Sequence, residues 1–293
     1  MNRMQASLST AAYSSRPDIR WARTWAPLAL AGACLVLAVP GMRAEAQDAL
    51  ILPQEDAPVP EAASPRGDWT FVLGGGVRVA PSYEGSDKFS VSPLPFVAID
   101  WRDRVFLDMA RGIGVNVVRT DALRLGVSVG LAPGRNEDDE DHLKGLGDID
   151  MAARGHVFGS YSFGMWQIGL DVAKDFGGSE GLQVRPEMSV KVPLSETWTL
   201  SSGVSATWAN DDYMQSFFGI SPSQSRKSGL ERYDAGAGFK SVDFKVGLNW
   251  AISESWFATA NVGVGVLLGD AADSPITESR VQPSVGLAVG YRF

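Results

Sequence analysis

The sequence contains very little cysteine or histidine. Cys34 is the single cysteine among 293 residues, and His142 and His156 are the two histidines. One cysteine cannot form an intramolecular disulfide, so the small disulfide-stabilised scaffolds are excluded. With 45% apolar and 20% charged residues, the composition lies in the globular range and does not by itself decide the fold.

An excess of positive charge is also missing. The chain has 26 lysines and arginines against 34 aspartates and glutamates, which gives a formal net charge of -8 at pH 7. Nucleic-acid binding depends on basic surface that neutralises phosphate groups. We therefore expect no nucleic-acid partner.

The N-terminal apolar run is too short for a membrane-spanning helix. It covers Ala26–Val39, 14 residues against the roughly 20 that span a bilayer. Three arginines precede it and an A-x-A sequence follows at residues 44–46, which predicts a signal peptide over residues 1–46, with an uncleaved anchor as the alternative. Residues 47–68 are rich in proline and predict an extended periplasmic segment.

Helical spacing is not convincing in any segment, and apolar residues instead alternate with a period of two. In Thr197–Asn210 the even-numbered positions include Trp198, Leu200, Val204 and Trp208, and we call such alternate apolar positions the apolar parity of a strand. The other parity carries glycine, serine and threonine. This pattern indicates a β-strand with one apolar face and recurs through residues 69–293, so we predict an all-β fold.

The polar parity decides which face lies inside. Its residues are mostly small, with a few charges of both signs, which suits a crowded polar interior better than a soluble surface. The predicted strands have 11 to 15 residues in the clearest cases, longer than the roughly 5 to 6 usual in soluble proteins and enough to cross a bilayer with tilt. Because unpaired backbone groups are costly in hydrocarbon, we predict a closed transmembrane antiparallel β-barrel over residues 69–293.

The sidedness of the connections predicts the number of strands. We place strands at 70–80, 90–101, 122–132, 148–160, 163–174, 181–193, 197–209, 239–252, 256–268 and 280–293. Long outer loops then alternate with short periplasmic turns if residues 104–119 contribute two strands that turn near Ala110–Gly112. This predicts twelve strands, with ten as the alternative.

Tryptophans near the strand ends are typical of aromatic girdles at the two membrane surfaces. Trp198 and Trp208 share one face and lie about 33 Å apart along the strand, or roughly 25 Å along the membrane normal after tilting. Trp250 and Trp256 also lie near strand ends. We predict that these four residues form the girdles.

The polar parity offers little catalytic chemistry. A hydrolase site around His156 is conceivable, but paired charges inside the barrel explain the pattern better. The expected lumen charges are Arg78, Arg124, Asp150, Arg154, Asp171, Arg185, Glu187, Asp243, Lys245 and Arg292. We predict no enzyme activity and no cofactor.

Two shorter patterns also receive structural explanations. The acidic run Asn136–Asp141 lacks the spacing of a calcium-binding loop, so we expect a solvated loop and no metal. Glycines 74–76 follow no phosphate-loop pattern and, as strand glycines, allow bending or close packing.

Several separated motifs resemble the MipA/OmpV family. They are GGGVRVAPSYEGSD from residue 74, PLP at 93–95, GLGDID at 145–150, DFGGSEGL at 175–182, TWANDDYMQSFFGIS at 207–221, SGLERYDAGAGFKS at 228–241, LLGDAADSPI at 267–276 and the terminal YRF. The resemblance implies a barrel in the outer membrane of a Gram-negative bacterium, in contact with its lipid. It also implies that Tyr291, Arg292 and Phe293 form the terminal signal for the barrel-assembly machinery.

The resemblance leaves two functions open. One is a non-enzymatic scaffold for peptidoglycan-remodelling enzymes, with a lytic transglycosylase and a murein synthase as partners. The other is a small solute or ion channel. The aromatic loop at residues 210–238 is expected either to fold into the barrel mouth or to form a contact surface.

Overall fold

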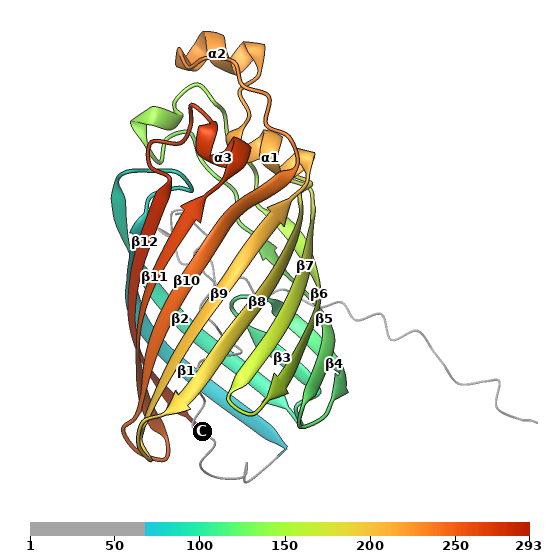
Figure 1. The fold of residues 1–293 in the computed structure, drawn as a ribbon, viewed down its shortest axis with the longest axis vertical. Helices are drawn as coiled ribbons and strands as arrows, with labels where there is room; N and C mark the ends of the chain where they lie inside the picture. Colours follow the sequence, from blue (N-terminus) through green and yellow to red (C-terminus); the bar gives the residue numbers. More distant parts are fainter. Residues whose placement is uncertain (1–67) are drawn as a thin grey trace, which may run out of the picture. The chain divides into compact units, whose positions relative to one another are not determined.

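Residues 68–293, which a computed structural model describes, form a closed antiparallel barrel of twelve strands (Figure 1). The predicted signal peptide and nearly all of the predicted periplasmic segment lie outside the described residues. The strands are β1 (Trp69–Pro81), β2 (Phe89–Trp101), β3 (Val105–Asp108), β4 (Gly112–Arg119), β5 (Leu123–Ala132), β6 (Ala152–Phe163), β7 (Trp166–Phe176), β8 (Leu182–Pro193), β9 (Trp198–Ala209), β10 (Gly238–Ala251), β11 (Trp256–Leu267) and β12 (Val281–Arg292). The predictions of an all-β barrel and of twelve strands are confirmed.

The barrel closes between its first and last strands. Every strand pairs with its neighbours in the sequence, and β1 pairs with β12 from Val72 opposite Arg292 to Val79 opposite Val285. Residues 104–119 form the two strands β3 and β4, as the parity of the loops required. We call the β1–β12 pairing the seam. Because it closes the sheet, the backbone groups of both strands form hydrogen bonds there that hydrocarbon could not supply.

The outer surface of the barrel is apolar on all sides. Leu73 on β1, Ile113 on β4 and Val262 on β11 expose 56%, 60% and 59% of their surface, while their strand neighbours point inward. An apolar band of this extent is unfavourable in water and suits a lipid environment. The alternation in the sequence therefore becomes an apolar outer face and a polar inner face.

The two ends of the barrel differ in their connections. Tight turns join the strands at the end where the chain terminates, and long loops with short helices lie at the other end (Figure 1). The helical segments are η1 (Asp141–Leu143), α1 (Asp211–Phe218), α2 (Pro222–Ser228) and α3 (Gly269–Asp273). Helical spacing in the sequence predicted none of them, because the four segments are too short to produce a clear helical period. No helix within residues 68–293 is long and apolar enough to cross a membrane.

The β6–β7 hairpin differs in register from its prediction. The sequence predicts strands at 148–160 and 163–174, whereas the turn between β6 and β7 consists of Gly164 and Met165. Gly164 has a φ of 62°, a conformation that glycine adopts readily, so the tight turn forms there. Both strands consequently start and end later in the chain.

Glycine at position 76 allows close packing across the seam between β1 and β12. A Cβ atom at Gly76 would lie 2.0 Å from the Leu287 carbonyl oxygen, whereas one at Gly75 would meet nothing within 4 Å. We expect Gly76→Ala to lower the free energy of unfolding by about 1–3 kcal/mol, because the strands must separate. Urea unfolding followed by tryptophan fluorescence measures this. Gly75→Ala is the matched control, and equal stability of the two variants would contradict the explanation.

Candidate functional site: the barrel interior and its loop cap

Charged side chains on the inner face form a mixed-sign group around Lys245. Lys245 on β10 interacts electrostatically with four other predicted lumen residues, Arg78, Arg185, Glu187 and Asp243. The group therefore contains three cations and two carboxylates contributed by β1, β8 and β10. Selective ion pores use rings of one charge sign. This arrangement instead distributes opposite charges across the interior.

A second polar group lies on β6 and β7. The Arg154 guanidinium donates two hydrogen bonds to Asp175, at 2.5 and 3.0 Å. His156 Nδ1 lies 3.2 Å from both carboxylate oxygens of Asp171. A hydrolytic triad would need a hydroxyl at His156 Nε2, but that buried nitrogen has no hydrogen-bond partner within residues 68–293. The geometry is that of paired structural charges.

Two arginines and two phenylalanines pack together inside the barrel near β3. The Arg111 guanidinium lies 4.5 Å from the ring centre of Phe158 and 5.3 Å from that of Phe106. Arg124 lies 5.4 Å from both rings, and its Nε donates to Asn116 at 2.8 Å. Cation–π contacts of this kind stabilise guanidinium groups away from bulk water.

Asp150, one of the predicted lumen charges, lies outside the barrel strands. It precedes β6, which begins at Ala152, and its side chain is exposed. The cause is a β-bridge between Arg135 and Ile149, which belongs to the loop and delays the start of the strand. The strand predicted at 148–160 therefore extended too far toward the loop, because β6 begins at Ala152.

The acidic run Asn136–Asp141 takes part in holding this loop together. Glu137 accepts hydrogen bonds from the backbone N–H groups of Gly145 and Gly147, both at 2.9 Å. Glu140 pairs with Lys88 at 2.7 Å, and this contact keeps the pKa of Glu140 below its usual value. Within residues 68–293 no group of three or more potential ligands is arranged to hold a metal ion.

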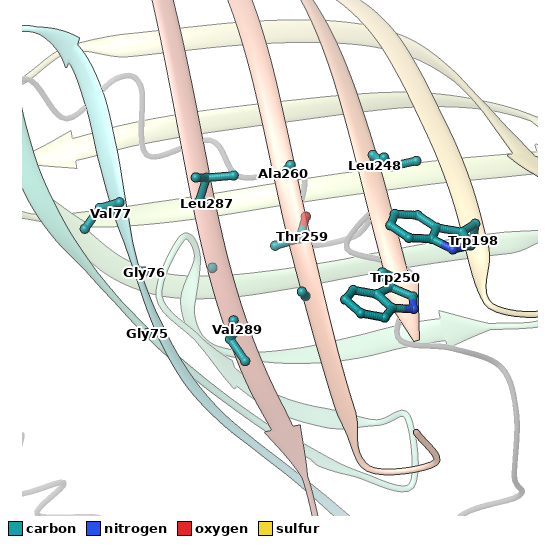
Figure 2. Close-up of a pocket in the computed structure, with 12 residues that line it drawn as sticks. Gly75, Gly76, Val77, Trp198, Leu248, Trp250, Thr259, Ala260, Leu287 and Val289 are labelled. Atoms are coloured by element: carbon teal, nitrogen blue, oxygen red, sulfur yellow. The ribbon is translucent and has the colours of Figure 1, made fainter. Parts of the chain in front are cut away.

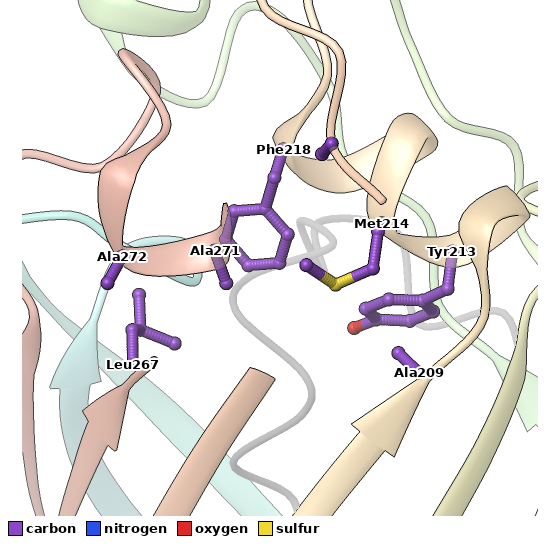
Figure 3. Packing of buried hydrophobic residues seen from close by; sticks show 8 residues of the cluster. Ala209, Tyr213, Met214, Phe218, Leu267, Ala271 and Ala272 are labelled. Carbon is purple, nitrogen blue, oxygen red and sulfur yellow. The ribbon is translucent and has the colours of Figure 1, made fainter. Parts of the chain in front are cut away.

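The loop at residues 210–238 folds over the barrel mouth. Its helix α1 starts at the N-cap Asn210, whose side chain accepts a hydrogen bond from the Tyr213 N–H. Tyr213, Met214 and Phe218 point from this helix toward α3 and the end of β11 (Figure 3). The resulting apolar cluster contains Ala209, Tyr213, Met214, Phe218, Ala235, Leu267, Ala271 and Ala272.

A second apolar cluster joins four of the long connections. It comprises Tyr83, Leu143, Leu146, Ile220 and Ile276, one or two from each connection, and all are buried. We call the two clusters and the loops that carry them the loop cap. Their burial shows that the loops pack against one another as a small core and do not extend separately into solvent.

Buried polar groups link the loop cap to the barrel wall. The Lys240 ammonium on β10 is 3% exposed and lies 2.7 Å from a carboxylate oxygen of Glu84. It also donates to the Tyr213 hydroxyl at 3.1 Å, which in turn donates to Glu84 at 3.1 Å. A wall strand, the β1–β2 loop and α1 therefore meet at one charged group.

Two further polar residues are buried in the loop cap. The Tyr83 hydroxyl contacts the Ile276 carbonyl at 3.0 Å and Glu278 at 2.9 Å, and burial together with Glu278 raises the pKa of Tyr83. Arg135 donates to the Phe217 carbonyl at 2.7 Å. Burial lowers the pKa of Arg135 to about 10, so it remains charged at neutral pH.

Sequence alternation could not reveal the Lys240 site. Lys240 shares the parity of Val242 and would face lipid in a regular strand. A bulge between Phe239 and Ser241 shifts the register, so Lys240 and Ser241 are both buried. The one sequence signal was a lysine that interrupts the apolar parity of the strand.

Three of the predicted girdle tryptophans lie at the tight-turn end. Trp198 and Trp250 stack with ring centres 5.3 Å apart, and Trp256 packs edge-on against Tyr291 at 5.0 Å. Trp208 lies near the loop end, opposite Phe239 in the strand register. Aromatic side chains thus lie toward both ends of the apolar band.

The stacked tryptophans border a shallow groove on the outer wall. Figure 2 shows Trp198 and Trp250 at one side of this groove and Leu287 and Val289 of β12 at another. Its volume is about 500 Å³, and small side chains such as Ala260 lie between its sides. The groove is almost wholly apolar and contains none of the predicted lumen charges.

Comparisons with known proteins place the chain in a family. A family model described as "MltA-interacting protein MipA" matches residues 73–293. No curated protein matches the sequence.

Three solved structures of other proteins are among those to which the chain is similar. They are the "KdgM porin" (8% identity, TM-score 0.38, 76% of this chain and 99% of that chain), a "Bacterial polysaccharide outer membrane secretin" (8%, 0.42, 77% and 97%) and a loop-deletion mutant of OmpT, an outer membrane protein of Vibrio cholerae (8%, 0.35, 77% and 98%). These likenesses are too low to indicate a ligand or a partner.

Proposed function

The chain belongs to the MipA family of MltA-interacting proteins, and from this premise we propose that it is a non-enzymatic outer-membrane scaffold for a peptidoglycan-remodelling enzyme. The observation that carries the proposal, beside the family, is the loop cap. Its two apolar cores cover the mouth, which suits a barrel that presents a surface better than one that conducts solutes. The mixed charges of the interior support the same choice.

The proposed orientation places the long loops outside the cell and the tight turns in the periplasm. This is the usual arrangement of outer-membrane barrels in Gram-negative bacteria. Peptidoglycan lies in the periplasm, so a lytic transglycosylase or murein synthase would bind at the tight turns. Exposed charged residues there include Arg102 in the β2–β3 turn and Glu196 in the β8–β9 turn.

Site-specific photocrosslinking in native envelopes tests the scaffold. A photoreactive residue at Glu196, in a tight turn, is expected to capture a lytic transglycosylase or a murein synthase, identified by mass spectrometry. The same residue at Lys227, exposed in helix α2 of the loop cap, serves as the control and is expected to capture neither. If photoreactive residues placed in each of the tight turns all failed to capture a murein enzyme, the scaffold proposal would be overturned.

A channel remains the second candidate because the inner face carries charges at Arg78, Arg185, Glu187, Asp243 and Lys245. Planar-bilayer recording separates the two candidates. A scaffold with a capped mouth is expected to show no steady single-channel conductance, whereas steady conductance without a captured murein enzyme would favour the channel.

A further inference from the structure

The barrel wall is incomplete between β2 and β5 on the loop side. β3 is only four residues long and pairs with β2 only from Ala98 to Trp101. Within residues 68–293, no strand lies beside residues 89–97 of β2 on the side away from β1. On the other side, the β4 ladder along β5 ends at Val129. Each strand is therefore hydrogen-bonded to both of its neighbours around the whole barrel only in the half near the tight turns.

Backbone alternation shows which groups face this gap. The Arg102 N–H donates to the Asp68 carbonyl at 2.9 Å, and the Ser82 N–H donates to the Lys88 carbonyl at 3.0 Å. Even-numbered residues of β2 therefore bond to β1, and odd-numbered residues direct their backbone groups toward the gap. Two of those odd-numbered residues are Pro93 and Pro95.

The prolines disfavour another strand in the gap. Proline has no N–H, so two of the five odd-numbered residues from 89 to 97 cannot donate across the gap, and an edge with few donors pairs poorly with an additional strand. Pro133 follows the last residue of β5 on the facing edge, so both sides of the gap carry proline. This argues against a strand from a partner protein or a second copy as the occupant.

The rim of the gap is apolar on its outer side. Phe89, Val91 and Leu131 expose 55%, 69% and 61% of their surface and continue the lipid-facing band. On the inner side, Leu94 lies on the same strand, and Phe96 packs against Phe257 with ring centres 6.2 Å apart. Apolar surface therefore borders the edge of β2 on both faces.

The dimensions of the gap suit a lipid-like molecule. β2 and β5 are separated by three strand spacings at β3 and β4, roughly 14 Å. The open edge extends roughly 26 Å along β2 and roughly 10 Å along β5, from Gly130 to Ala132, and the Lys88–Glu140 ion pair lies at its loop-side end. The carbonyl groups that face the gap need water or a polar ligand, because hydrocarbon alone leaves them unsatisfied. An amphiphile offers both an apolar chain and a hydrogen-bonding head group.

We propose that the gap between β2 and β5 is a lateral opening through which a single-chain amphiphile passes between the bilayer and the barrel interior. Its hydrocarbon chain contacts the apolar rim, and its head group bonds to the carbonyl groups of the β2 edge. Because the loop cap covers the mouth, the lateral opening supplies another route into the interior from the loop side. The proposal is independent of which protein partner the barrel binds.

Single-cysteine labelling of the full-length protein in liposomes tests the opening. In a Cys34→Ser background, Ser92→Cys places a thiol on the inner face of β2 beside the gap. Ser205→Cys places one on the inner face of β9, which pairs there with both β8 and β10. The probe is hexadecyl maleimide, and N-ethylmaleimide corrects for the intrinsic reactivity of each thiol.

The expected result is that hexadecyl maleimide labels Ser92→Cys at least about tenfold faster than Ser205→Cys, because a continuous wall admits no chain without breaking its hydrogen bonds. Equal corrected rates would overturn the proposal. If the two labelling rates were equal and the protein formed dimers in detergent, the gap would be an interface between two copies, and the proposal would also be overturned.

A second variant closes the gap. Lengthening the β3–β4 hairpin by about eight residues on each strand, between Asp108 and Gly112, adds roughly 26 Å to the wall and carries β3 past Ser92 in the register of its pairing with β2. In the Ser92→Cys background, labelling is expected to fall to the rate of Ser205→Cys, and an unchanged rate would contradict the lateral route. If the longer hairpin does not assemble, the comparison of the two single cysteines still decides.

Discussion

Deletion of Phe293 is expected to leave most of the protein unassembled in the envelope. The Phe293 N–H donates to the Phe71 carbonyl at 3.0 Å and extends the β1–β12 seam past its last strand pair. Its ring packs against Tyr291 at 4.7 Å, and Tyr291 packs against Trp256. The deletion removes both this last seam bond and the aromatic end of the proposed assembly signal. The amount of heat-modifiable barrel in isolated outer membranes measures the loss.

A matched control separates the signal from general loss of aromatic surface. Phe239→Ser removes an outward-facing ring that is 56% exposed, against 71% for Phe293, and lies near the loop end away from the seam. It is expected to assemble nearly as well as the natural sequence. Phe293→Tyr keeps the ring and is expected to assemble. Normal assembly of the deletion variant would show that the terminal residues are not the signal, although the barrel itself would stand.

The sequence predicted the barrel well because strand alternation is a local property. Apolar and small polar residues alternate through most of Thr197–Asn210, which forms β9, and the sidedness of the loops alone required β3 and β4. The turn predicted near Ala110–Gly112 already limits β3 to a few residues, and β3 ends at Asp108.

The loop cap was the less predictable part, for two physical reasons. Its helices are one to two turns long, so their apolar residues do not repeat often enough to show a helical period. Its central ion pair joins residues 156 positions apart, and a bulge directs Lys240 inward against the parity of its strand. The sequence did mark the aromatic loop that contains Tyr213 as unusual, and that loop supplies part of the core.

Glu84→Ala is expected to destabilise the loop cap more than any other single change in it. The variant removes the carboxylate that pairs with the buried Lys240 ammonium and leaves the hydrogen bond from this ammonium to the Tyr213 hydroxyl. Breaking a buried ion pair on one side costs about 3–5 kcal/mol, because the remaining charge is uncompensated. Amide hydrogen exchange of residues 211–228 measures the opening of the cap separately from unfolding of the barrel, which is expected to change much less.

Two controls show whether the buried charge is the cause. Asp273→Ala breaks the Arg280–Asp273 pair, whose side chains are 62% and 61% exposed. It is expected to change the free energy of opening obtained from hydrogen exchange by no more than about 1 kcal/mol. The double variant Glu84→Leu with Lys240→Met replaces both charges by apolar groups and is expected to recover most of the protection. If the double variant opened as readily as Glu84→Ala, Glu84 would stabilise the cap through contacts other than Lys240. If Glu84→Ala kept its protection, the apolar clusters alone would hold the loops over the mouth.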